Sequence, residues 1–519
     1  MKKRLIDFIS ANGRYIALFS CLIVGILSRF AFLNSAPAGL NQDEAYAGYE
    51  ALCLLKYGTD SYGYRFPMYL TAWGSGMNAL YSYLTIPFLF LFGNHVWVIR
   101  LPQAIIAVLT IYAIFKLVET QYSYKVAFCI SGLLAITPWH IMQARYGLES
   151  NLAPGFLIFG LLFFVKGIKN SKYYMLSAFF YGLTIYCYSA IWIIIPVIVF
   201  LQLLYVLLMK KMKPDIFVMI AFLILCVMAT PALLFILVNS GYIEEIRTSF
   251  ISIPKMLYFR GGDISVDNIP ANLLYTAKML FLQNDELIWN SIDKFGIYYH
   301  GAQLFSLIGF GICIRQIVVG IKKKQLELSV FLMIQFIAAL LIGATVQVNI
   351  TRINAIHISI VAFNAIGLMA VINLIAKKIK IIKYVAIVGM LGIFVLFMGY
   401  YIKRYVPVLG TFYQDGIIEA VDKAMDLSND NETVICVRNV YYPKILLLAE
   451  VSPGTYINET EYEYYPSAYL HPTRIGNIYF EIPPENEECV YIVSYWFADE
   501  YRAQGYQVIT YKEICVAYK

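Results

Sequence analysis

The chain has 519 residues, of which 60% are hydrophobic and 14% charged, and its mean hydropathy is +0.66. Soluble domains carry about a quarter charged residues, so this composition excludes an ordinary soluble enzyme and predicts a membrane protein. The nine cysteines are scattered without CxxC or metal-binding spacing, which argues against a disulfide framework.

Apolar runs long enough to cross a bilayer recur through the first 400 residues. We predict eleven spans, near residues 15–33, 98–118, 126–143, 152–168, 173–188, 190–209, 215–238, 302–321, 328–345, 355–376 and 384–402. Basic clusters such as KGIKNSK, IKKK and KKIKIIK lie between spans, and assigning them to the cytoplasm puts every cluster on one side. The same threading places residues 34–97, residues 239–300 and the tail after Lys403 outside the cytoplasm.

The basic clusters also account for the net charge. Residues 411–519 contain 17 acidic and 7 basic residues, a net charge of −10, so residues 1–410 carry +17. Because the bias of lysine and arginine toward cytoplasmic loops explains this excess, the charge predicts no nucleic-acid partner.

Two further helices are predicted in the first outer loop, residues 34–97. The stretch NQDEAYAGYEALCLLKYG (41–58) has the pattern of an amphipathic helix. The stretch GMNALYSYLTIPFLFLFG (76–93) is apolar but short and rich in aromatic residues for a span. We expect both to be interfacial helices on the outer side of the membrane.

The tail, residues 405–519, changes pattern. VICVRNV, CVYIVSYW and YQVITYKEICVAY alternate as strands do, whereas FYQDGIIEAVDKAMDLS, YPKILLLAEV and FADEYRAQG have helical spacing. The predicted fold class is therefore an α-helical polytopic membrane domain, residues 1–404, followed by a small extracytoplasmic α/β domain. The tail lacks a GxGxxG loop, a nucleophile elbow and a metal cluster, so we assign it an accessory role.

An adjacent pair of carboxylates, Asp43 and Glu44, follows the first span by only ten residues. Helix capping is the structural explanation, because Asn41 and Glu44 have capping-box spacing and acids favour the first turn of a helix. Glu44 satisfies this explanation better than Asp43, which is left over.

The other charges near the outer ends of spans also have ordinary explanations. Arg145 and Glu149 are four residues apart, as in an intrahelical ion pair, and Arg352 at a span end suits a snorkelling side chain. Arg65 lies in the first outer loop. All of these residues nevertheless gather at one face of the membrane, where ionisable groups are candidates for a functional site.

Carboxylates and arginines at an outer bilayer surface suit glycosyl transfer from a polyprenyl-phosphate sugar. A carboxylate takes the proton of the acceptor hydroxyl as that hydroxyl attacks the anomeric carbon. Negative charge helps the oxocarbenium-like transition state, and a guanidinium stabilises the departing phosphate. The scissile bond of a membrane-held donor lies at the interface, which is where Asp43 and Glu44 are expected.

At these residues the sequence resembles the GT-C membrane glycosyltransferases, in the branch of the protein O-mannosyltransferases and bacterial aminoarabinose transferases. The resemblance covers about residues 15–210 and is carried by the Asp-Glu pair, by LFGNHVWVIRLPQAIIAVLT and by TPWHIMQARYGLESN. It implies that Asp43 is the catalytic base, that Glu44 supports it, and that Glu149 is the acidic residue of the second outer loop.

The sequence departs from the family at the donor phosphate. Many members have a Lys-Pro-Pro stretch whose lysine serves this phosphate, whereas this chain has TAWGSGMNALY there and no lysine. The role then falls to Arg65, Arg145 or Arg352. We predict Arg352, with Asn349 and Asn354 beside it to bond the same phosphate or the sugar.

The resemblance implies no fixed cofactor, because metal dependence varies within the superfamily and a divalent metal ion is left as an alternative. The five histidines, with His140 and His357 nearest the outer boundary, have no recognisable metal-binding spacing. The implied partners are a polyprenyl-phosphate sugar donor and a lipid, glycan or protein acceptor, at the extracytoplasmic side of the cell membrane.

Two other classes of function compete with an inverting glycosyltransferase. A transporter or lipid-linked glycan flippase needs polar groups along a midplane pathway and broken helices, whereas the spans here are mostly uninterrupted. A non-catalytic scaffold or polymer-export subunit is the third reading. In both alternatives neutralisation of Asp43 is tolerated.

Overall fold

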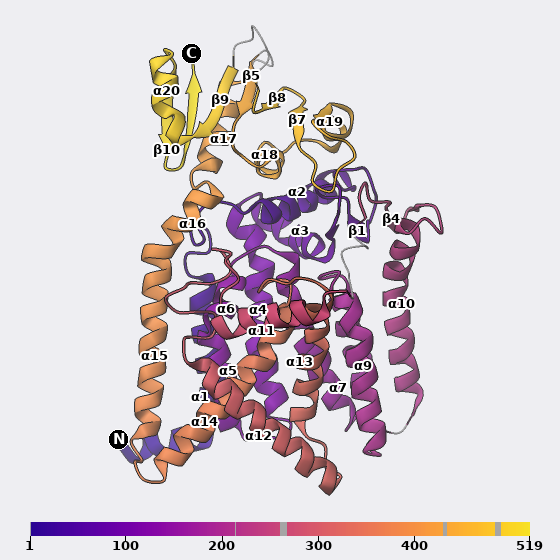
Figure 1. Ribbon diagram of the computed structural model, residues 1–519, viewed down its shortest axis with the longest axis vertical. Coiled ribbons are helices and arrows are strands. Elements are labelled where there is room, and N and C mark those ends of the chain that lie inside the picture. Colours follow the sequence, from indigo (N-terminus) through magenta and orange to yellow (C-terminus); the bar gives the residue numbers. More distant parts are fainter. Residues whose placement is uncertain (1, 213, 260–266, 429–432, 483–488) are drawn as a thin grey trace.

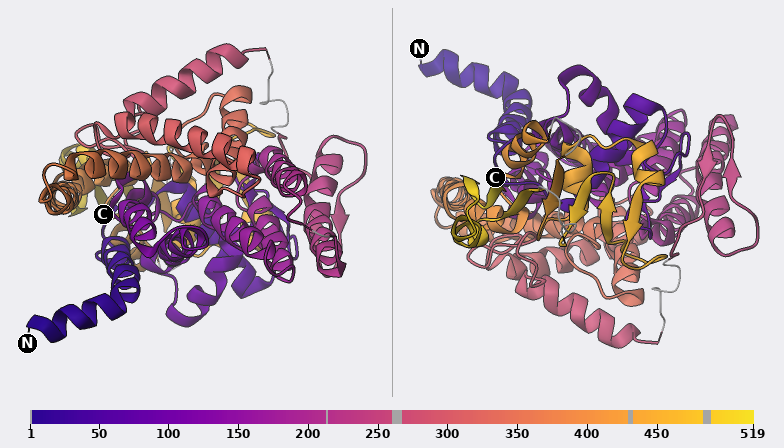
Figure 2. Two further views of the ribbon diagram at one scale, coloured as in Figure 1. Left: turned by 90° about the horizontal axis from the view of Figure 1, so that it is seen from below. Right: turned by 90° about the horizontal axis from the view of Figure 1, so that it is seen from above.

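Long helices run along the long axis of the molecule, and a small α/β unit covers one end of them (Figure 1). The computed structural model describes residues 2–212, 214–259, 267–428, 433–482 and 489–519. Seen from above, the strands of the C-terminal sheet lie over the ends of the long helices (Figure 2).

Within these described residues, nine helices are long and apolar enough to cross a membrane. Their helical cores are α1 (Lys2–Phe30), α4 (Val96–Val118), α7 (Ala153–Gly167), α9 (Ile191–Leu208), α10 (Ile216–Asn239), α12 (Ala302–Lys323), α13 (Leu328–Thr345), α14 (His357–Ala376) and α15 (Ile382–Tyr400). The prediction of a polytopic helical membrane protein is confirmed.

The other two predicted spans form shorter helices, α5 (Tyr124–Ile136) and α8 (Tyr173–Ile185). The span predicted at 126–143 ends early because the residue before Pro138 is disfavoured in a helix. Thr137 is extended, with φ −68° and ψ 127°, and a separate short helix, α6 (Pro138–Gln143), follows it.

The first outer loop contains α2 (Gln42–Tyr57), β1 (Tyr69–Leu70), β2 (Met77–Asn78) and α3 (Leu80–Phe92). The two predicted helices therefore exist, but the amphipathic surface placement of the first is wrong. Ten consecutive residues of α2, from Glu44 to Cys53, are buried. The helix is covered on different sides by α3 and by α18 (Tyr442–Leu448) of the C-terminal region, so it lies inside the protein.

The predicted outer loop 239–300 contains β3 (Ile246–Arg247), β4 (Ser252–Ile253) and α11 (Ile269–Leu282), while its residues 260–266 lie outside the described residues. Helix α11, which the sequence reasoning missed, packs against α13. Short turns connect other elements, namely η1 (Glu149–Leu152), η3 (Asn354–Ile356) and the π-helix η4 (Tyr401–Tyr405).

The C-terminal region is a mixed sheet with helices. Its strand order is β10-β11-β9-β5-β8-β7-β6, and β5 lies parallel to both β8 and β9. The strands are β5 (Val434–Val437), β6 (Thr460–Tyr462), β7 (Pro472–Ile475), β8 (Ile478–Phe480), β9 (Cys489–Ser494), β10 (Gln507–Tyr511) and β11 (Ile514–Tyr518). The helices are α16 (Val406–Tyr413), α17 (Ile417–Leu427), α18, α19 (Pro453–Asn458), η5 (Tyr495–Phe497) and α20 (Ala498–Ala503).

The predicted α/β character of this region is confirmed, with two differences. The last predicted strand, 506–518, is a hairpin of β10 and β11, because Lys512 adopts a positive φ of 52° and turns the chain. Strands β6, β7 and β8, of three or four residues each, were not predicted.

Two carboxyl groups are buried together beneath the C-terminal region. Glu50 of α2 accepts hydrogen bonds from the backbone N–H and the hydroxyl of Ser61, and Asp60 accepts from the N–H groups of Tyr62 and Tyr64. Burial raises the pKa of both carboxyls, and repulsion between Glu50 and Asp60 raises the pKa of Glu50 further.

Stability should therefore fall as the pH rises above the ordinary carboxyl range. A carboxyl with a raised folded-state pKa stabilises the folded state while protonated and loses that contribution as the pH rises through the folded-state value. Asp60→Asn keeps the acceptor oxygen but cannot ionise, so its melting temperature should decline less than that of wild type between pH 5 and pH 9. The control is Glu450→Gln, which alters an exposed carboxylate paired with Lys56. Equal slopes for Asp60→Asn and wild type would contradict the assignment.

Candidate active site

Asp43 lies in the first turn of α2, at the junction between the long helices and the C-terminal region. Asn41 is the N-cap, and its side chain accepts from the N–H groups of Asp43, at 2.8 Å, and of Glu44, at 3.3 Å. The Asp43 side chain therefore does not serve as the cap. It is partly buried, and its Oδ1 accepts from Trp73 Nε1 at 3.1 Å.

Glu44 has a different environment from its neighbour. Its side chain is fully buried. The carboxylate accepts hydrogen bonds from Arg100 Nε at 2.9 Å, from Arg100 Nη2 at 3.0 Å and from the backbone N–H of Gly147 at 2.9 Å. The carboxylate half of the predicted capping box is therefore replaced by a two-pronged ion pair. Such a pair fixes geometry as well as charge, so the structure gives Glu44 a positioning role.

Arg100 and Arg145 together hold the connection between α1 and α2. Arg100 donates to the carbonyls of Leu33, Pro37 and Gly39 at 2.9–3.0 Å. A second set of bonds runs from Arg145 to the carbonyls of Ser28 at 2.7 Å, Ala31 at 2.6 Å and Ala36 at 2.8 Å. Both guanidinium groups are fully buried.

The ion pair expected between Arg145 and Glu149 does not form among the described residues, and the physical reason is local. Helix α6 ends at Gln143, and η1 begins only at Glu149, so no helix carries both side chains. Each Arg145 nitrogen instead has a backbone carbonyl as its partner. Because these three bonds and full burial hold the guanidinium inside the protein, the structure argues against Arg145 as the ligand of a donor phosphate.

Glu149 and Asp43 are brought together from two segments. Glu149 is partly buried and accepts a hydrogen bond from the N–H of Asn78 in β2, the strand that pairs with β1 across the loop containing Trp73. The two carboxylates lie within electrostatic range of each other. Two acidic groups of the predicted set therefore share one site, with Trp73 and Asn78 as neighbours.

Asn354 and Arg352 lie on the segment that approaches this site from the far part of the chain. Asn354 is buried, accepts from Trp139 Nε1 at 2.9 Å and donates to Asn151 Oδ1 at 2.9 Å. It therefore ties its segment to η1, the turn that carries Glu149. Arg352 is exposed, and among the described residues its guanidinium makes a single long contact, 3.4 Å to the Gln347 carbonyl.

Arg65 is exposed on the loop before β1, where its backbone carbonyl accepts from the Ser252 hydroxyl at 2.6 Å. In the described part of the chain, no hydrogen bond joins the side chain of Arg65 to Asp43 or Glu149. The prediction that Arg65 helps to bind the donor phosphate gains no support from this position.

The described residues contain no group of three His, Cys, Asp or Glu side chains that could hold a metal ion. His140 is bonded to Arg29 at 2.7 Å, and His357 lies between the Tyr298 hydroxyl and the Ile350 carbonyl. Both histidines are buried and have structural partners.

Trp73 is the site residue that the sequence reasoning missed. Its φ of 61° is rare for a residue with a side chain, and such strain is often found at functional sites. The available signal was a tryptophan beside Gly74 and Gly76, both of which also have positive φ.

Comparisons with known proteins bear on this fold. The family model for dolichyl-phosphate-mannose-protein mannosyltransferase matches residues 79–241. Among solved structures, the chain is similar to ArnT from Cupriavidus metallidurans bound to undecaprenyl phosphate, with 12% identity, a TM-score of 0.56 and 98% of each chain covered. No curated protein sequence matches it.

Two further structures are similar. The apo state of the same ArnT has 12% identity and a TM-score of 0.52, again with 98% of each chain covered. The apo oligosaccharyltransferase from Archaeoglobus fulgidus has 12% identity and a TM-score of 0.48, with 85% of this chain and 64% of that chain covered.

The chain therefore has the fold of the solved ArnT structure, and its residues 79–241 match the mannosyltransferase family model. The resemblance stated from the sequence is confirmed at this level. The segment that matches the family model contains Arg100, Arg145 and Glu149, whereas Asp43 lies before it.

Glu44→Gln should destabilise the protein. Loss of one partner of a buried ion pair leaves an uncompensated charge, which typically costs about 3–5 kcal/mol. The measurement is the thermal unfolding of detergent-purified protein. Glu450→Gln is the matched control, because Glu450 pairs with Lys56 and both side chains are exposed, and exposed pairs contribute only about 0–1 kcal/mol. A Glu44→Gln variant as stable as the control would show that the pair does not hold the site.

Proposed function

We propose that this chain is a membrane glycosyltransferase that transfers a sugar from a polyprenyl-phosphate donor to an acceptor hydroxyl. The observation that carries the proposal is the separation of roles within the acidic pair. Glu44 is held in a buried ion pair with Arg100. Asp43 is partly exposed and lies near a second carboxylate, Glu149. The chain that contains them has the fold of ArnT.

The reaction is an inverting displacement. The acceptor oxygen attacks the anomeric carbon and transfers its proton to Asp43 as general base. The bond between the anomeric carbon and the phosphate oxygen breaks, and its electron pair leaves with the polyprenyl phosphate. Glu149, near Asp43, is assigned to binding of the substrate. The solved ArnT structure contains undecaprenyl phosphate, which supports a lipid phosphate as the carrier.

The active site and residues 405–519 are assigned to the extracytoplasmic side of the cell membrane. The support is the set of lysine-rich turns, all of which the threading places at the opposite ends of the spans. Residues 1–404 form the transferase domain in this proposal, and the C-terminal domain is accessory. The acceptor is a lipid, a glycan or a protein.

Asp43→Asn should abolish turnover while the protein remains folded. Asparagine keeps an oxygen for the Trp73 indole but cannot accept the proton, and loss of a general base typically costs about 10²- to 10⁴-fold in rate. The measurement is sugar transfer from a synthetic polyprenyl-phosphate donor by protein of unchanged melting temperature.

Asp215→Asn is the matched control, because Asp215 is also an aspartate at a helix start, the N-cap of α10, and asparagine caps equally well. Transfer near the wild-type rate by Asp43→Asn would refute the assignment of the base and favour a transporter or scaffold.

Arg352 is proposed to bind the donor phosphate, since it is the exposed arginine on the segment tied to η1. Loss of one charged hydrogen-bonded contact typically costs about 1.5–3 kcal/mol, or roughly 10- to 150-fold. Arg352→Ala should lose this factor in single-turnover rate with unchanged stability. Arg145→Ala should instead lower the melting temperature. If Arg352→Ala stays within about threefold of wild type in donor binding and rate, the phosphate ligand is another residue.

A further inference from the structure

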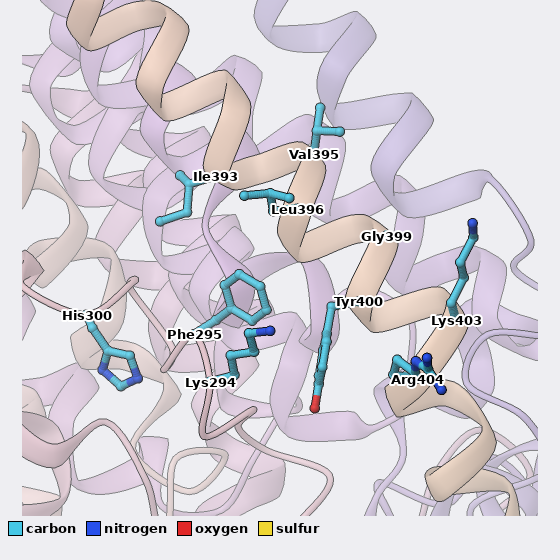
Figure 3. Close-up of a pocket in the computed structure, with 10 residues that line it drawn as sticks. All are labelled: Lys294, Phe295, His300, Ile393, Val395, Leu396, Gly399, Tyr400, Lys403 and Arg404. Atoms are coloured by element: carbon cyan, nitrogen blue, oxygen red, sulfur yellow. The ribbon is translucent and has the colours of Figure 1, made fainter.

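A cavity of about 580 Å³ lies between the end of α15 and the segment that includes residues 294–300. Figure 3 shows Lys294, Phe295 and His300 of that segment opposite side chains of α15 and the π-helix η4. The cavity belongs to neither the Asp43 site nor the Arg352 segment, because none of those residues lines it.

The lining of this cavity is amphipathic. Three cations, Lys294, Lys403 and Arg404, lie at it together and are exposed. None of the three forms an ion pair with a carboxylate in the described part of the chain. The apolar part of the lining includes Ile393 and Leu396, which lie one to two helical turns earlier on α15.

The cations lie at the end of α15 that is remote from the basic cluster KKIKIIK (377–383). The bias of basic residues toward one side of a membrane therefore does not explain them. A cationic end joined to an apolar strip along a membrane helix is complementary to a lipid with an anionic headgroup.

The π-helix produces this arrangement. A π-turn inside an α-helix shifts the faces of the residues that follow it, and such turns are frequent at functional sites. In η4 the rings of Tyr401 and Tyr405 are buried, while Lys403 and Arg404 are exposed. The guanidinium of Arg145 lies 5.8 Å from the Tyr401 ring. The wall of the cavity is thus backed by the arginine that holds the chain leading to Asp43.

The same outer segment also contacts the residues next to Arg352. Asp285 accepts from the N–H of Ile350 at 2.8 Å, and Asn290 accepts from the Thr351 hydroxyl at 2.8 Å. The cavity and the proposed donor-phosphate ligand are therefore joined by one continuous stretch of chain, about 285–300.

We propose that this cavity is a second lipid-phosphate site, which holds the released polyprenyl phosphate carrier outside the reaction centre after sugar transfer. A phosphate monoester carries up to two negative charges and suits a site lined by three exposed cations, one of which, Lys294, also lies 5.0 Å from the Tyr400 ring, whereas a phosphodiester headgroup carries one negative charge. The single prenyl chain of this lipid lies along Ile393, Leu396 and Gly399. This assignment rests on the proposed function only for the identity of the carrier.

The charge test measures the retention of undecaprenyl phosphate by the full-length protein in detergent, using native mass spectrometry across a lipid titration. Lys403→Gln combined with Arg404→Gln should weaken retention by roughly 10-fold or more. Lys380→Gln combined with Lys383→Gln, at the other end of the same helix, should leave it unchanged. Equal retention by the two double variants would overturn the proposal.

The steric test uses Gly399. A Cβ atom added there would have no other atom within 4 Å, so Gly399→Phe places a bulky side chain at the lining from an open backbone position. It should reduce retention about as strongly as the charge variant and leave the melting temperature unchanged. Gly389→Phe, at an equally open glycine of α15, is the matched control. Retention by Gly399→Phe equal to that of the control would overturn the proposal.

The remaining arms separate this site from its alternatives. Phosphatidylglycerol that displaces undecaprenyl phosphate at equal concentration would indicate a general contact with anionic lipid and overturn the proposal. If Arg352→Ala reduces retention of undecaprenyl phosphate and the cavity variants do not, the lipid is bound at the reaction centre and the proposal is overturned. Asp43→Asn should retain the lipid. Retention that depends on Lys403, Arg404 and Gly399 in a protein without transferase activity would support this site while refuting the proposed function.

Discussion

The buried ion pair between Glu44 and Arg100 is the constraint on which the candidate site depends. Both side chains are fully buried, with nitrogen–oxygen distances of 2.9 and 3.0 Å. Such a pair is tolerated only where the geometry is good and the remaining donors are satisfied. Arg100 meets this condition through the carbonyls of Leu33, Pro37 and Gly39. Asp43, the residue directly before Glu44, is thereby fixed at the edge of the buried region.

The C-terminal region fixes the same segment from the other side. The Tyr413 carbonyl accepts from the N–H of Leu40 at 3.0 Å and from Lys444 Nζ at 3.2 Å. Gly39 has a φ of 73°, and a side chain there would come within 2.4 Å of the Tyr413 oxygen. Burial lowers the pKa of Lys444 to about 7. The C-terminal region therefore contributes to the placement of Asp43 by packing against the segment that leads to it.

Hydropathy was sufficient to predict the helical membrane architecture, because it depends on composition over some 20 residues. The alternation of the tail likewise predicted an α/β region. Arg145 was harder, since its partners Ser28, Ala31 and Ala36 are more than a hundred residues away and local spacing indicated Glu149 instead. Trp73 was missed for the same reason, because its contact with Asp43 exists only after the first outer loop folds.

The arginines of this chain divide by the partners that their N–H groups have in the folded protein. Arg100 and Arg145 are surrounded by carbonyl oxygens, and their use as phosphate ligands would require breaking the chain connection that they hold. Arg352, Lys403 and Arg404 are exposed and retain donors for an anion. The sequence predicts that all five of these residues lie near the outer face, so that position alone does not distinguish the buried side chains from the exposed ones. The distinction is set by burial, because a buried guanidinium must satisfy its donors within the protein, whereas an exposed one remains available to a ligand.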